Sequence, residues 1–187
     1  MYKTIGFEIK GLAPLMTKNG QTCDPLNEHA KAMKEISKKR VKTEEDYEAL
    51  SRLDWFGALY LNDDGRPCIP GENIEAMFIS AAKKSKQGPQ AKAGILSDGL
   101  WPIIYAGPKD MDALYDTRKF IDRRSVKVSQ SRVMRTRPIW REWSLKFEVS
   151  YMADIFNKSE VVALLKVAGE IICLGDYRPK FGRFEIA

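Results

Sequence analysis

The segment from Trp143 to Tyr151 places an apolar or aromatic side chain at every second position. Because successive side chains of a β-strand point to opposite faces, this alternation predicts a long strand with one buried face. We therefore expect a core strand of nine or more residues. The segments before and after it decide which kind of core it belongs to.

Strands are also predicted at both ends of the chain. Ile5, Phe7 and Ile9 alternate with polar residues, and Gly11 and Pro14 end this first strand. The final residues, 183–187, read RFEIA and predict a short closing strand. A further strand is expected at residues 55–61, WFGALYL.

Two helices are predicted between these strands. The first carries one apolar face, with Asn73 as its expected N-cap and three lysines in its last turn. The second begins at Asn157 or Ser159 and is expected to stop at Gly175, since glycine favours the position after a helix. The face of the first helix comprises Ile74, Met77, Phe78, Ala81 and Ala82, followed by Lys83, Lys84 and Lys86.

The order of these elements predicts an α+β fold with a ferredoxin-like (RRM-like) βαββαβ core. Two segments interrupt the core. A helical insertion spans about 24–53, where Thr43 caps its second helix, and an extension spans about 87–139, which we expect to be a basic β-ribbon or thumb. The length of 187 residues is that of a single domain, 1–187.

Positive charge is concentrated in one segment. The chain has a net charge of +6, and residues 118–146 alone carry ten basic and two acidic side chains. Such an excess is typical of a surface for polyanions, although a solvated basic loop is the alternative. Arginines alternate here with aromatic residues, as in single-strand binding proteins. The candidates are Arg132, Arg135, Arg137 and Arg141, of which the last three are expected to point to the same side of an extended segment.

The closing segment, GDYRPKFGRFEIA, is a second candidate for binding nucleic acid. Its two glycines would let backbone N–H groups approach phosphates, its basic residues would neutralise them, and its aromatic residues would stack on a base. The alternative is a helix-terminating turn whose aromatic rings pack on the core. The candidates are Gly175, Tyr177, Arg178, Lys180, Phe181, Gly182 and Arg183, and Lys83 and Lys84 complete the predicted binding residues.

The sequence lacks the catalytic and nucleotide-binding motifs of most enzyme classes. It contains one histidine, His29, and none of the common nucleotide-binding or hydrolase motifs. Three widely spaced cysteines predict free thiols, and neither a metal site nor a cofactor is expected. No apolar run is long enough for a membrane span and the N-terminus lacks a signal-peptide pattern, which predicts a cytoplasmic protein.

Two segments resemble the RAMP superfamily, which includes the backbone subunits of CRISPR interference complexes. Ile69, Pro70 and Gly71, with Asn73 and Ile74, are similar to its I-P-G-S-S-I-K-G strand-to-helix entry, and residues 181–184 are similar to its C-terminal glycine-rich loop. At positions 75 and 76, a glutamate and an alanine replace the basic residue and the glycine of that pattern. The resemblance implies single-stranded nucleic-acid binding through the sheet, the glycine-rich loop and a thumb.

The chain also resembles small stand-alone proteins of bacteriophage and prophage genomes, on residues 11–16 and 175–184. From the residues and both resemblances we expect a non-enzymatic protein that binds single-stranded RNA or DNA and multimerises head to tail along the strand. The first alternative is a phage-encoded protein that mimics or inhibits a host nucleic-acid complex, in which the basic surface meets an acidic protein. The second is a ribonuclease that uses His29.

Overall fold

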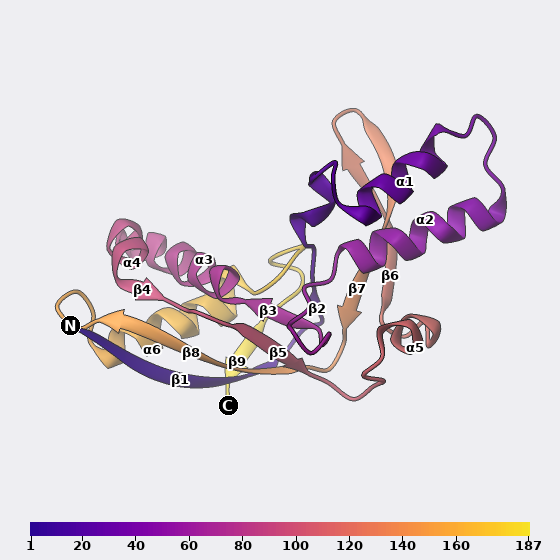
Figure 1. Ribbon diagram of the computed structural model, residues 1–187. Helices are drawn as coiled ribbons and strands as arrows, with labels where there is room; N and C mark the ends of the chain where they lie inside the picture. The colour runs from indigo at the N-terminus through magenta and orange to yellow at the C-terminus, as the bar shows by residue number, and fades with distance from the viewer. The chain divides into compact units, whose positions relative to one another are not determined.

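The computed structural model describes residues 1–187 and has the mixed α+β fold that the sequence predicts (Figure 1). The chain divides into two compact units. Unit 1 contains residues 1–16, 61–107 and 140–187, and unit 2 contains residues 17–60 and 108–139. Each unit therefore brings together segments that are far apart in the sequence.

Unit 1 is built on an antiparallel sheet whose centre is the pair β1 (Tyr2–Gly11) and β8 (Ser144–Met152). The predicted long strand is confirmed as β8. The sheet order is β3-β5-β8-β1-β9, and β4 also pairs with β8. The other strands of this sheet are β3 (Cys68–Pro70), β4 (Ile95–Leu96), β5 (Leu100–Ile104) and β9 (Phe184–Ile186). The short strand β2 (Leu15–Met16) does not belong to it.

Helices cover one face of this sheet (Figure 1). They are α3 (Gly71–Ala82), extended by the short turn η2 (Lys83–Ser85), then α4 (Gly88–Gly94) and α6 (Lys158–Val167), which continues as the π-helical turn η3 (Ala168–Ile172). The predicted apolar face of α3 is confirmed, since all five of its residues are buried. Phe7 of β1 lies between Phe78 and Phe147, with ring centroids 6.4 and 5.7 Å away.

The start of α3 differs from the predicted cap at Asn73. The helix begins at Gly71, and its N-cap makes no side-chain hydrogen bond. The N–H of Gly71 donates instead to the carbonyl of Gly99 at 2.8 Å. A Cβ on Gly71 would lie 1.6 Å from the carbonyl oxygen of Ser97, so only glycine fits this close backbone approach.

The end of the last helix also differs from the prediction. The helical turn η3 ends at Ile172, and Cys173 adopts the left-handed region with φ 68°. Gly175 does not stop the helix; it lies in the following loop with φ 80°. The prediction relied on the preference of glycine for positive φ at a helix end. It therefore did not anticipate that a non-glycine residue, Cys173, would take this position.

Unit 2 contains the helices α1 (Glu28–Lys38), α2 (Glu44–Gly57) and α5 (Met111–Asp116), the turn η1 (Gly20–Cys23) and a β-hairpin. The predicted helical segment is present, and Thr43 caps α2 through a capping box with Asp46. The hairpin pairs β6 (Ile121–Val128) with β7 (Ser131–Trp140), whose last residue lies in unit 1. This hairpin is the β-ribbon expected within the extension.

The strand predicted at residues 55–61 is wrong, because α2 continues to Gly57. Trp55 is fully buried in unit 2, and its Nε1 donates to the carbonyl of Phe120 at 2.9 Å. A short apolar run does not by itself distinguish a strand from a buried helix end. Contacts made 65 residues further along the chain decide the outcome here.

The extension predicted at 87–139 also has a different boundary. Residues 88–104 form α4, β4 and β5, which belong to unit 1, and the excursion into unit 2 begins at residue 108. Ala91, Ile95 and Ile103 are buried in unit 1. These few apolar side chains hold the segment on the sheet despite its glycines and prolines, which obscured the pattern in the sequence.

Candidate nucleic-acid interface

The C-terminal loop, residues 173–183, is closed by backbone hydrogen bonds within unit 1. The N–H of Leu174 donates to the carbonyl of Gly182 at 2.9 Å, and the N–H of Gly182 donates to Pro14 at 2.8 Å. The N–H of Asp176 donates to the carbonyl of Met16 at 2.7 Å. Residues 11–16 thus form one side of the loop, so the two segments that carry the resemblance to phage proteins lie in contact.

The two glycines of this loop serve its own closure. Gly182 has φ 77°, and a Cβ there would lie 1.7 Å from the carbonyl oxygen of Leu174. Gly175 has φ 80°, and its Cβ would lie 2.3 Å from the carbonyl oxygen of Met16. Because the N–H of Gly182 is bonded to Pro14, it is not available to a phosphate. The glycines therefore shape the loop, and the Gly182 N–H takes no part in binding a ligand.

The side chains of the loop gather basic and aromatic groups at the surface. Tyr177, Arg178, Lys180 and Arg183 are exposed, and Phe181 is half-buried. The rings of Tyr177 and Phe181 lie 5.8 Å apart, and the Lys180 ammonium lies 5.9 Å from the Phe181 ring. The structure thus brings these five predicted residues together.

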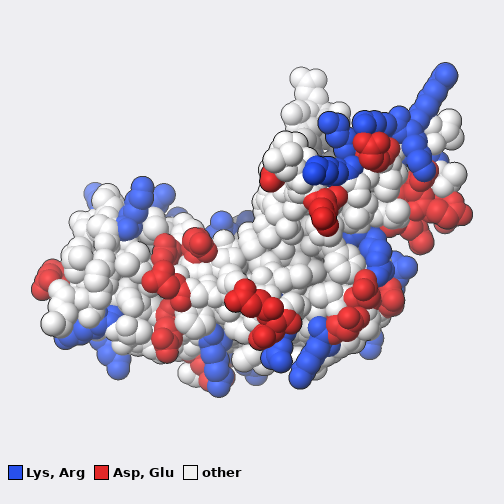
Figure 2. Space-filling model, in the orientation of Figure 1, with Lys and Arg blue, Asp and Glu red and all other residues white.

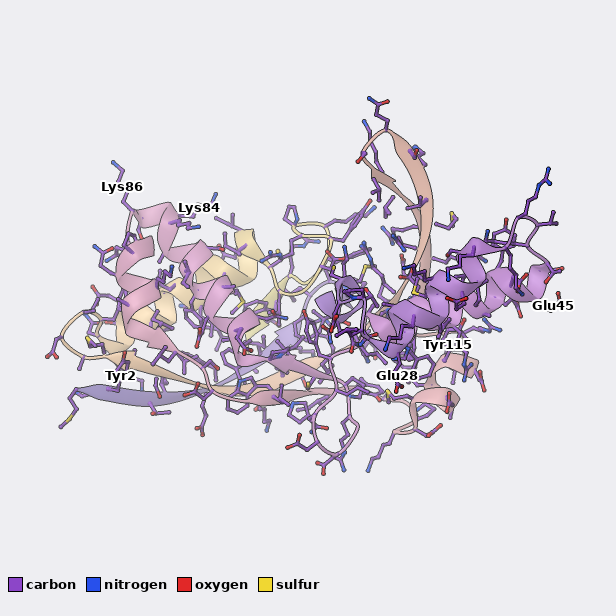
Figure 3. All side chains as sticks on the ribbon, turned by 45° about the horizontal axis from the view of Figure 1, so that its top comes forward. Tyr2, Glu28, Glu45, Lys84, Lys86 and Tyr115 are labelled. Carbon is purple, nitrogen blue, oxygen red and sulfur yellow. The ribbon has the colours of Figure 1, made fainter.

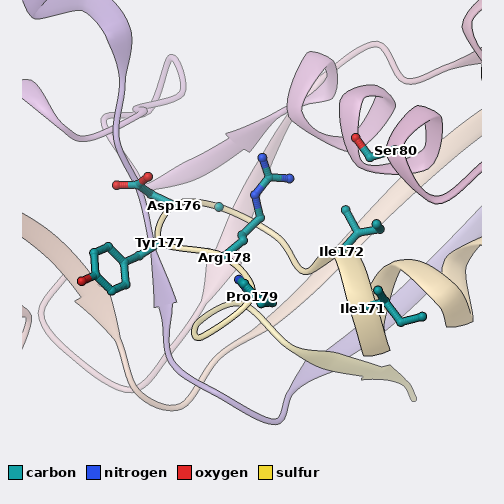
Figure 4. A pocket seen from close by; sticks show the side chains of 8 residues that line it. Ser80, Ile171, Ile172, Asp176, Tyr177, Arg178 and Pro179 are labelled. Carbon is teal, nitrogen blue, oxygen red and sulfur yellow. The ribbon is translucent and has the colours of Figure 1, made fainter. Parts of the chain in front are cut away.

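A hollow of about 540 Å³ adjoins this loop in unit 1. Figure 4 shows Arg178 extending into it toward the helix that carries Ser80, while Tyr177 points to the other side of the loop. Lys84 and Lys86 project from the end of the same helix, α3 (Figure 3). Lys83 and Lys84 are exposed, as a phosphate contact requires.

The open face of the sheet in unit 1 offers little to a nucleic acid. Thr4 bonds to Ser150 across β1 and β8 at 2.9 Å, and Lys146 pairs with Glu8 at 3.1 Å. Tyr2, at the end of β1, is the one aromatic residue on the outward face of these two strands. This face therefore lacks the charge excess and the aromatic rows that single-strand binding surfaces use.

Unit 2 contains a basic cavity of about 370 Å³. Arg135 and Arg137 line it from β7, and two further cations, Lys18 and Lys34, line it from the segment before η1 and from α1. The one acidic residue in the lining is Asp54 of α2. Four basic side chains around a single carboxylate leave an excess of positive charge, which suits a phosphate group.

Asp54 is held in place by partners from β7. It accepts a hydrogen bond from the N–H of Thr136 at 2.7 Å, and its other oxygen lies 3.7 Å from the guanidinium of Arg135. Burial raises the pKa of the Asp54 carboxyl above its usual range, while the Thr136 N–H and the charges of Arg135 and Arg137 act in the opposite direction. The carboxylate is thus a partly desolvated counter-charge inside the basic cavity.

The predicted arginines of the hairpin do not form one row. Arg135 and Arg137 point to the same side as expected, but Arg132 pairs with Lys127 on the opposite face of the ribbon. Arg141 lies beyond β7, in unit 1. Figure 2 shows basic and acidic side chains interspersed over α1 and α2, so these helices add no further basic surface in that view.

Sequence reasoning missed Lys18, Lys34 and Asp54. Lys18 follows β2 and Lys34 is one of several lysines along α1. No spacing in the sequence relates these three residues to Arg135 and Arg137, which lie 81 or more residues further along the chain. The one helpful pattern in the sequence was the pair of arginines two positions apart. It indicated the extended segment that forms β7, but not the residues of other segments that share the cavity with it.

His29 and the three cysteines are the remaining side chains that the sequence offered for chemistry. His29 packs near the ring of Phe56, with centroids 6.5 Å apart, and no three His, Cys, Asp or Glu side chains are placed to hold a metal ion. The predicted free thiols are confirmed, and burial raises the pKa of Cys68 to about 11. No helix combines the length and the apolar character needed to cross a membrane.

Comparison with solved structures finds a similar fold. The chain matches one in the cryo-EM structure of the Type III-B Cmr-beta bound to cognate target RNA, with a TM-score of 0.52 and 11% sequence identity. The match covers all of this chain and 59% of the other, so the protein spans somewhat more than half the length of that neighbour. No protein-family model and no curated protein matches the sequence. The likeness concerns the fold alone.

Proposed function

We propose that the protein binds single-stranded RNA or DNA through the phosphate backbone, without cutting it. The observation that carries this proposal is the basic cavity of unit 2, where two predicted arginines and two lysines surround one carboxylate. Cations from three separate segments converge on one hollow, which is how proteins hold a phosphate without reading the base sequence. The C-terminal loop supplies a second group of exposed cations and rings.

We further propose that unit 1 is a ferredoxin-like, RAMP-like core. The strand order β5-β8-β1-β9 supports this, since it is the order of a βαββαβ fold in which α3 and α6 are the two helices. The similar solved chain belongs to an assembly described as bound to target RNA. Multimers formed head to tail along a strand are part of the same proposal.

Fluorescence anisotropy with labelled single-stranded RNA, single-stranded DNA and duplexes tests the proposal. We expect both single strands to bind more tightly than duplexes, with a salt dependence of about 0.7 logarithmic units per phosphate neutralised. Failure to bind any strand at low salt would overturn the proposal and favour an acidic protein partner. Shortened RNA products would favour the ribonuclease instead. Light scattering of the saturated complex measures the number of copies per strand.

The double variant Lys18→Ala, Lys34→Ala is expected to weaken single-strand binding roughly fivefold and to lower the salt slope by about 0.7 per lysine. Both side chains are exposed, so the fold should keep its stability. The matched control is Lys158→Ala, Lys166→Ala, which removes the same charge from exposed positions on α6. Equal losses in the two variants would mean that only net charge matters and would contradict a phosphate site in the cavity.

The triple variant Arg178→Ala, Lys180→Ala, Arg183→Ala tests the C-terminal loop. All three side chains are exposed, and the backbone bonds that close the loop do not depend on them. We expect weaker single-strand binding at an unchanged melting temperature, because only charge is removed. If this variant stays folded and binds as tightly as the parent, the loop takes no part in binding.

A further inference from the structure

A second cavity of unit 2, of about 620 Å³, shares part of its wall with the basic cavity. Met33, Ser37, Asp54 and Arg135 line both cavities, so the two hollows are neighbours on either side of the Asp54–Arg135 pair. The second cavity has a different chemistry. Much of its lining is apolar or aromatic, from α1, α2 and β7: Met33, Tyr47, Leu50, Val133 and Met134.

We propose that this second cavity takes an unstacked nucleobase of the same strand whose phosphate occupies the basic cavity. This inference rests on the proposed function and adds a base-binding site to it. A nucleotide joins an anionic phosphate to a flat, largely apolar base. The two adjoining hollows offer cations for the first and apolar walls with an aromatic ring for the second.

Two side chains at this cavity are exposed enough to contact a base. Tyr47 of α2 has 52% of its surface exposed, and Met134 of β7 is equally exposed. Isolated apolar side chains are common on protein surfaces, but these two line one hollow together with buried or half-buried neighbours. A tyrosine ring presented in this way can stack on any base.

The hydroxyls of Ser37, Ser51 and Thr136 at this cavity are already engaged within the protein. Ser37 donates to the carbonyl of Met33 at 2.7 Å, and Ser51 and Thr136 share a hydrogen bond of 2.8 Å between their hydroxyls. Arg123, exposed on β6, is the cation at the lining besides Arg135. The base is therefore held by stacking and apolar contact, with little discrimination between the four bases.

The test compares a labelled oligothymidine with an abasic strand of the same length and phosphate number. We expect the parent protein to bind the abasic strand at least fivefold more weakly. Tyr47→Ala should weaken oligothymidine binding about fivefold and leave binding of the abasic strand unchanged, whereas Tyr47→Phe should bind like the parent. Tyr2→Ala, at an exposed tyrosine of β1 in unit 1, is the matched control and should bind both strands like the parent.

The outcomes separate the inference from the proposed function. Equal binding of the two strands by the parent, with no effect of Tyr47→Ala, overturns the base site and leaves phosphate binding in place. Absence of binding to either strand overturns both. An equal loss on both strands in Tyr47→Ala also overturns the base site, since it shows that the tyrosine does not act through the base.

Discussion

Gly182→Val is expected to lower the free energy of unfolding by at least about 2 kcal/mol. Gly182 has φ 77°, which a β-branched residue adopts only with strain. Its new Cβ would also lie 1.7 Å from the carbonyl oxygen of Leu174. The neck of the loop must then open, and the hydrogen bonds joining Gly182 to Leu174 and Pro14 are lost.

Urea unfolding followed by circular dichroism measures this change, and Gly6→Val is the matched control. Gly6 lies in β1, where an added Cβ meets nothing within 4 Å and the backbone is that of a strand. The control should therefore change the free energy of unfolding by less than about 1 kcal/mol. Two variants of equal stability would contradict the closed geometry of the C-terminal loop.

Asp54→Asn is expected to strengthen single-strand binding at least tenfold at neutral pH. The carboxylate is the one acidic group in the basic cavity. In a partly buried site, two unit charges about 4 to 8 Å apart interact by roughly 2 to 4 kcal/mol, which exceeds the 1.4 kcal/mol of a tenfold change. Asparagine keeps an oxygen that can accept the Thr136 N–H, so the fold should be retained.

Both the stability of the protein and its binding of single strands should depend on pH through Asp54, each in a definite direction. Because the pKa of Asp54 is raised, the carboxyl takes up a proton more readily in the folded protein, and its contribution to stability falls as pH rises through the raised value. At neutral pH, Asp54→Asn should thus be at least as stable as the parent. Protonation also removes the counter-charge, so oligothymidine should bind the parent more tightly as pH falls from neutral toward the raised pKa of Asp54.

Anisotropy titrations of both proteins across this pH range test the prediction. The variant should show a smaller pH dependence, since thymine does not titrate there and the cavity carboxyl is absent. Glu35→Gln is a suitable control, because it removes one negative charge from an exposed position on α1 outside the cavity lining. Weaker binding by Asp54→Asn would show that the carboxylate positions Arg135 for the phosphate instead of competing with it.

Local periodicity was enough to predict some elements of the core but not α4, β4 and β5. The alternation in β8, the apolar face of α3 and the cap at Thr43 are properties of neighbouring residues, and each is confirmed. The clustering of positive charge in residues 118–146 likewise located the hairpin that supplies Arg135 and Arg137.

Contacts between distant segments decided what local patterns left open. Residues 55–57 are helical, and Trp55 is buried with its indole bonded to Phe120. The glycines of the C-terminal loop approach Leu174 and Met16 in the fold, where the sequence had suggested a phosphate.

The candidate site itself comes from tertiary structure. Lys18, Lys34 and Asp54 reach the arginines of β7 because residues 17–60 and 108–139 pack into one unit. Periodicity reports which face of an element is buried, but it does not report which distant element covers that face. The sequence by itself determined that this protein is an α+β fold with a concentrated basic segment, and only the tertiary structure decided which residues share a cavity with it.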